Sequence, residues 1–133
     1  MSEILIIWIM SILQCLIAFG LINVWLVRFS RPTQYRGAGT KNMKEEFSAY
    51  GLPSWSVYVV GSLKIAIALI MILVLLKPHL TMKLGIPAAI ALVVLMLGAI
   101  SMHIKVKDSL KQTAPAITML VMSIALIIVV LVS

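Results

Sequence analysis

Residues with reactive side chains are scarce in this chain of 133 residues, which has one cysteine, two histidines and four acidic residues. Because Cys15 stands alone, an intrachain disulfide, a CxxC redox pair and a thiolate metal site are excluded. The four carboxylates lie outside the long apolar runs, so the acidic relay of a proton pump is missing. The chain also lacks a nucleophile elbow and a phosphate-binding glycine loop. We therefore do not expect an enzyme that acts on its own.

Charged residues make up only 11% of the chain, whereas 62% of its residues are apolar. Soluble domains are nearer about 45–50% apolar and about 25% charged, and a domain of this length cannot hide so much hydrocarbon from water. Eleven Lys and Arg against four Asp and Glu give a net charge of +7. Because the basic residues fall mostly between apolar runs, they indicate membrane topology rather than nucleic-acid binding. Membrane lipid is the expected partner, with attraction to anionic headgroups as an added effect.

Four apolar runs are long enough to cross a bilayer, since a spanning helix needs about 20 residues for roughly 30 Å of hydrocarbon. We place the spans at about 4–27, 55–76, 84–104 and 115–132. The first run is too long for a signal-peptide core and predicts a retained span. Prolines at 53, 87 and 115 stand before or in the first turn of spans two, three and four, and Pro78 ends span two. The predicted fold is all-α, one integral membrane four-helix bundle over residues 1–133, running up-down-up-down.

The long first loop, residues 28–54, begins with a turn-rich stretch and then predicts a short amphipathic helix over 43–50. Asn42 and Glu45 have the spacing of an N-cap and its reciprocal partner. Met43, Phe47 and Tyr50 follow at i, i+4 and i+7, which puts them on one helix face. We expect this helix to lie on the membrane or against the mouth of the bundle.

Basic residues are divided unequally between the two sides of the predicted bundle. The first and third loops share one side and carry eight Lys and Arg, whereas the other side has only Lys77 and Lys83. The positive-inside rule then predicts that loop 28–54 is cytoplasmic and that both termini lie outside.

One lysine interrupts a predicted span. Lys64 lies about nine residues into span two, roughly 13 Å from its start, where a lysine costs about 2.5–3.5 kcal/mol. One reading is a side chain that snorkels or is satisfied within the bundle, and the other is a cation that binds a ligand or a partner. His103 and Asn23 lie on the same basic-side half of the bundle as Lys64.

Several short segments, in this order and spacing, resemble the DoxX-like membrane proteins: AYGLPSW at 49–55, VGSLK at 60–64, and MLGA at 96–99 with His103 after it. Arg36-Gly37 and the segment 42–47 resemble a bacterial subgroup. The resemblance implies a small four-helix bundle of the bacterial inner membrane. It also implies a link to thiosulfate:quinone oxidoreductase and terminal oxidase complexes, or to oxidative-stress defence. The candidate ligand- or partner-binding residues are Lys64, His103, Asn23, Arg36, Glu45, Glu46 and Trp55.

Three functions stay open at this point. The first is an accessory or anchor subunit of a quinone-linked redox complex, with a small pocket near Lys64 for a quinone or a lipid and partner subunits on the basic side. The second is a non-catalytic scaffold whose first loop binds a cytoplasmic partner or anionic lipid. The third is a small transporter, which requires a homo-oligomer because four spans are few.

Overall fold

Four long apolar helices dominate the computed structural model, which describes residues 2–133. They are α1 (Glu3–Ile22), α3 (Ser56–Leu76), α4 (Ile86–Lys105) and α5 (Leu110–Val132). A π-helical turn, Asn23–Val27, extends α1, and a 3-10 turn, Pro78–Leu80, leads through the π-helical turn Thr81–Gly85 into α4. All four are long and apolar enough to cross a membrane, and no strand occurs between residues 2 and 133. The predicted all-α fold is confirmed.

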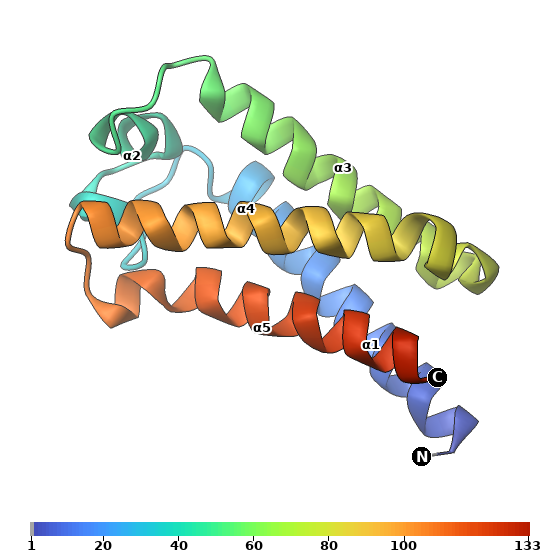
Figure 1. The fold of residues 1–133 in the computed structure, drawn as a ribbon. Coiled ribbons are helices and arrows are strands. Elements are labelled where there is room, and N and C mark those ends of the chain that lie inside the picture. The colour runs from blue at the N-terminus through green and yellow to red at the C-terminus, as the bar shows by residue number, and fades with distance from the viewer. Residues whose placement is uncertain (1) are drawn as a thin grey trace.

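The helices form a ring in which neighbours in the chain run in opposite directions (Figure 1). α1 packs against α3 and α5, and α4 packs against α5 and α3. Both termini lie at one end of the bundle, and the short helix α2 (Met43–Ala49) lies at the other end (Figure 1). We call this second end the α2 end.

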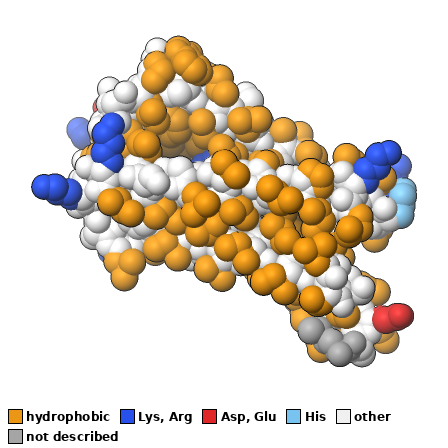
Figure 2. All heavy atoms as spheres, in the orientation of Figure 1, with side chains coloured by type: hydrophobic (Ala, Val, Ile, Leu, Met, Phe, Trp, Pro, Cys, Tyr) orange, Lys and Arg blue, Asp and Glu red, His pale blue; other side chains and the backbone are white. Residues whose placement is uncertain are grey.

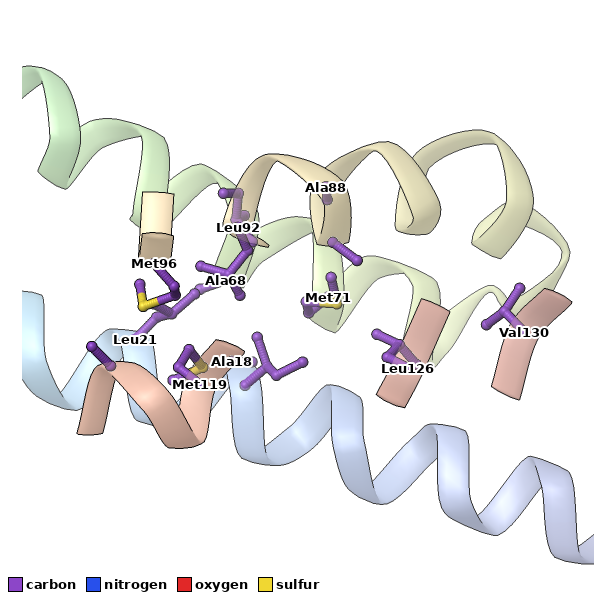
Figure 3. Close-up of a cluster of buried hydrophobic side chains, with 14 residues drawn as sticks. Ala18, Leu21, Ala68, Met71, Ala88, Leu92, Met96, Met119, Leu126 and Val130 are labelled. Atoms are coloured by element: carbon purple, nitrogen blue, oxygen red, sulfur yellow. The ribbon is translucent and has the colours of Figure 1, made fainter. Parts of the chain in front are cut away.

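The core mixes alanines with large apolar side chains from all four helices (Figure 3). Alanines at 18, 68, 88 and 89 bring backbones close together, and Met71, Leu92 and Leu126 fill the space between them. Such close packing stabilises helix association in lipid, where the hydrophobic effect between helices is absent. Outward-facing Leu, Ile and Val cover the sides, while Lys and Arg gather at the two ends (Figure 2). This surface suits a bilayer.

The fourth helix begins earlier than the sequence indicated. Pro115 was expected in its first turn, but α5 begins at Leu110 and contains Pro115 in its second turn. Ser109 and Gln112 form a capping box that satisfies the first N–H groups of the helix. Pro115 removes one N–H group near the start of the helix. Because the other N–H groups there have partners, the cap, not the proline, determines where α5 begins.

α2 takes the second of its two expected positions, against the mouth of the bundle. Met43 and Phe47 are buried against Trp25 and Val57. The Asn42 side chain accepts a hydrogen bond from the Glu45 N–H, as expected for an N-cap. The Glu45 carboxylate, however, reaches past Asn42 to the N–H of Lys41, at 2.9 Å.

Candidate functional site

The Arg36 side chain holds the turn-rich part of the first loop at the α2 end. Only 4% of this residue is exposed. One terminal nitrogen donates to the carbonyl oxygens of Arg28 and Arg31, at 2.6 and 2.7 Å. The other donates to Glu46 Oε2 at 3.0 Å, forming a buried ion pair. Three parts of the loop are thereby joined through one side chain.

The other Glu46 oxygen completes this cluster. Its Oε1 accepts hydrogen bonds from the Gly37 N–H at 2.8 Å and from the Tyr50 hydroxyl at 2.7 Å. Burial, together with the neighbouring Glu46 carboxylate, raises the pKa of Tyr50 well above its ordinary value. A Cβ on Gly37 would overlap the Tyr50 hydroxyl oxygen, so glycine is required where the loop meets α2. Since its oxygens already accept three hydrogen bonds, Glu46 serves to hold the loop.

A second polar group ties α4 and α5 to the same loop. His103 Nδ1 lies 2.7 Å from Asp108 Oδ2, and Asp108 Oδ1 accepts from the Ala38 N–H at 2.8 Å. The Gln112 amide donates to the Arg36 carbonyl at 3.1 Å. These contacts join residues about 70 positions apart in the chain and close the α2 end of the bundle.

Aromatic rings connect these polar groups to the interior of the bundle. The ring of His103 lies edge-on to Tyr50 with centroids 6.0 Å apart. Tyr50 contacts Phe47 at 6.1 Å, and Phe47 contacts Trp25 edge-on at 5.8 Å. Trp25 therefore stands at the inner end of a row of rings that begins at the end of α4.

Lys64 lies beyond Trp25, on α3. Its side chain is buried, with 8% of the residue exposed, and its Nζ lies 5.0 Å from the centre of the Trp25 ring. A cation over an indole face is attracted by the ring quadrupole. Gly61, one turn earlier, lets Trp25 approach α3, since a Cβ there would lie 2.8 Å from a ring carbon. Trp25 is the group that the structure places against this ammonium.

No hydrogen-bond acceptor and no carboxylate in residues 2–133 contacts the Lys64 ammonium. The other buried ionisable side chains at the α2 end have partners: Arg36 pairs with Glu46, and His103 lies within hydrogen-bond distance of Asp108. A buried ammonium costs free energy unless it is paired or hydrogen-bonded. Lys64 therefore lies beside the Trp25 ring without an acceptor among these residues. Within the same part of the chain, Arg36 Nε is buried and also has no hydrogen-bond partner.

The structure brings together four of the seven candidate residues and leaves three outside. Linked through the row of rings and the ion pairs are Lys64, Arg36, Glu46 and His103. On the exterior lie Asn23, Glu45 and Trp55, the last 64% exposed. Asn23 faces outward because Trp25, two residues on and therefore about half a turn away, faces inward.

Sequence reasoning missed Trp25, Tyr50 and Asp108 as members of the cluster. Trp25 and Phe29 are four residues apart, a spacing that would place them on one face of a helix, and their rings do meet at 6.1 Å although the helix ends at Val27. Asp108 follows His103 by five residues across the end of α4, which no helical spacing indicates. Within the part of the chain described, no three His, Cys, Asp or Glu side chains group to hold a metal ion.

Residues 12–126 match the DoxX-like family. Because this match covers most of the chain, the protein belongs to the DoxX-like family, as the sequence resemblance indicated. With its four candidate spans it is a multi-pass membrane protein. The chain matches none of the curated proteins and none of the solved structures.

Proposed function

We propose that this DoxX-like protein is an accessory subunit of a quinone-linked redox complex in the bacterial inner membrane, and that it holds a quinone-like molecule at Lys64. One observation carries the proposal: a buried lysine side chain inside a span, with an indole beside it and no acceptor from residues 2–133. A quinone suits this position. Its carbonyl oxygens accept hydrogen bonds, its ring is flat and apolar, and its tail is soluble in the surrounding lipid.

The same geometry weighs against a scaffold that binds a partner through the apolar face of α2. Met43 and Phe47, which make up much of that face, are buried in the bundle. The outer face of α2 carries the exposed residues Lys44, Glu45 and Ser48. Partner subunits of the redox complex would therefore meet a polar, mostly basic surface at the α2 end. The basic residues there favour a cytoplasmic position for loop 28–54, with both termini outside.

The test is extraction of bound quinone from the purified protein and its quantification by mass spectrometry. Lys64→Met removes the charge and shortens the unbranched side chain by one heavy atom, so the bundle should fold without the cost of a buried ammonium. We expect wild-type protein to retain quinone and Lys64→Met to lose it. Lys111→Met, an exposed lysine in the first turn of α5, serves as the control and should retain it.

Quinone-linked respiration in cells provides the second measurement. Lys64→Met should lower it, whereas Lys111→Met should leave it unchanged. A wild-type protein that carries no quinone, together with normal respiration in the Lys64→Met strain, would rule out the proposed function.

A further inference from the structure

An apolar groove of about 430 Å³ runs along the outer surface between the end of α1 and α3. Its lining includes Trp25, Phe29, Tyr58, Gly61, Ser62 and Leu69. Tyr58 and Leu69 are more than half exposed, so the groove opens sideways toward lipid. The groove shares Trp25 and Gly61 with the surroundings of Lys64, but neither Lys64 nor the polar side chains that hold the first loop belong to its lining.

The groove has the length of one leaflet. From Val57 to Leu69 the lining of α3 extends over twelve residue steps, or about 18 Å at 1.5 Å per residue. Half of a hydrocarbon core about 30 Å thick is about 15 Å. Because the groove begins at the α2 end, an acyl chain of the leaflet on that side could lie along it from its headgroup to its tip.

Two basic side chains stand where the headgroup of that lipid would be. Lys44 Nζ lies 5.6 Å from the centre of the Tyr58 ring, which lines the groove. Arg28 lies in the chain between Leu26 and Phe29, both lining residues, and is exposed. Neither takes part in an ion pair within residues 2–133. These charges are complementary to a phosphate or another anionic headgroup.

We propose that this groove binds one acyl chain of an anionic phospholipid, with the headgroup held by Lys44 and Arg28. A second copy of the chain fits less well. Two protomers in one membrane share the same orientation, so a two-fold contact through the groove would bring both basic mouths to the same depth. Like charges would then face each other.

Tryptophan fluorescence can test the proposal, because the chain has three tryptophans and only Trp25 lines the groove. Trp8 and Trp55, both exposed, are replaced by Phe, which leaves Trp25 as the sole emitter. The protein is placed in nanodiscs of phosphatidylcholine with a fixed fraction of phosphatidylglycerol, and the acyl chains of one or the other lipid are brominated. We expect brominated phosphatidylglycerol to quench Trp25 more strongly than brominated phosphatidylcholine does at equal mole fraction.

Two double variants separate a local headgroup site from a general effect of charge. Arg28→Gln with Lys44→Gln removes two charges at the groove and should reduce the preference for phosphatidylglycerol by about fivefold per charge. Lys107→Gln with Lys111→Gln removes two exposed charges on the same side of the bundle, away from the groove, and should preserve the preference. Ser62→Leu fills the groove and should weaken quenching by both lipids.

Three results would overturn the proposal. Equal quenching by the two lipids would mean that the groove does not select an anionic headgroup. An equal loss of preference in both double variants would mean that only the general surface charge attracts the lipid. Weak quenching by both lipids, together with a dimer of the protein that Ser62→Leu dissociates, would mean that a second copy occupies the groove. Quinone retention at Lys64 is measured separately, so these results leave the proposed function unaffected.

Discussion

Replacing Glu46 by glutamine should destabilise the protein far more than the same change at the neighbouring Glu45. Both residues belong to the first turns of α2, and both substitutions remove one negative charge. Glu46 is buried and accepts hydrogen bonds from Arg36, Gly37 and Tyr50. Glu45 is exposed and accepts one hydrogen bond, from the Lys41 N–H. The pair of variants therefore compares a buried carboxylate with an exposed one at adjacent positions.

The loss of free energy of unfolding depends on the groups that each substitution leaves without a partner. Glu46→Gln leaves the Arg36 guanidinium buried without a counter-charge, and removing one partner of a buried ion pair costs about 3–5 kcal/mol. The glutamine carbonyl oxygen still accepts a hydrogen bond, so we expect a loss of about 3 kcal/mol in the free energy of unfolding. An exposed hydrogen bond such as that of Glu45 is worth about 0.5–1 kcal/mol. The two variants should thus differ by about 2 kcal/mol.

The assay is unfolding by sodium dodecyl sulfate in mixed micelles, followed by circular dichroism. Arg36→Gln, alone and in the Glu46→Gln background, completes a double-mutant cycle. The double variant should be little less stable than Glu46→Gln alone, because removing the unpaired guanidinium offsets the loss of its hydrogen bonds to Arg28 and Arg31. If Glu46→Gln and Glu45→Gln lose the same free energy of unfolding within about 0.5 kcal/mol, the assignment of Arg36 and Glu46 as the group that holds the loop is wrong.

Three further predictions concern packing, pH and topology. Gly61→Ala should lower the free energy of unfolding by about 1–3 kcal/mol, because the new Cβ would lie 2.8 Å from the Trp25 ring. Gly98→Ala, with no heavy atom within 4 Å of its added Cβ, is the control and should be neutral or slightly stabilising in the same assay. The folded protein holds the Tyr50 proton where an unfolded tyrosine, with a pKa near 10.0, loses it. The free energy of unfolding should therefore fall as the pH rises past about 10, and Tyr50→Phe should remove this share of the fall. Absorbance titration should show one tyrosine that does not ionise until the protein unfolds. A reporter fused to the C-terminus should be active outside the cytoplasm, and an active cytoplasmic reporter would reverse the proposed orientation.

Hydropathy alone was sufficient to predict the four membrane helices, because the free energy of placing a side chain in lipid depends mainly on that side chain. The sequence also predicted the short helix α2, since its Asn42 cap and the spacing of Met43 and Phe47 are local signals within two helical turns. The start of α5 was not predicted correctly. Pro115 gave a strong local signal, but the capping box of Ser109 and Gln112, which begins six residues earlier, determines the boundary.

For the candidate site, too, the sequence predicted the local feature and not the contacts across the fold. Sequence identified Lys64 as a charge inside a span, because its depth follows from its position in an apolar run. It did not give the contact with Trp25, which depends on how α1 and α3 pack where Gly61 lets the indole approach. That contact joins residues 39 positions apart, and no helical period connects them.

By itself, then, the sequence determined that this protein spans a membrane four times, where its helices lie and which end is basic. These properties depend on the side chains of neighbouring residues, because each segment enters the bilayer as a helix that satisfies its own backbone groups. Only the tertiary structure decided which buried ionisable side chains have partners. Arg36 meets Glu46 and His103 meets Asp108 because the first loop folds back over the bundle, while Lys64 is left facing an aromatic ring. Pairing between charges depends on distances across the fold, and a linear chain does not contain those distances until it has packed.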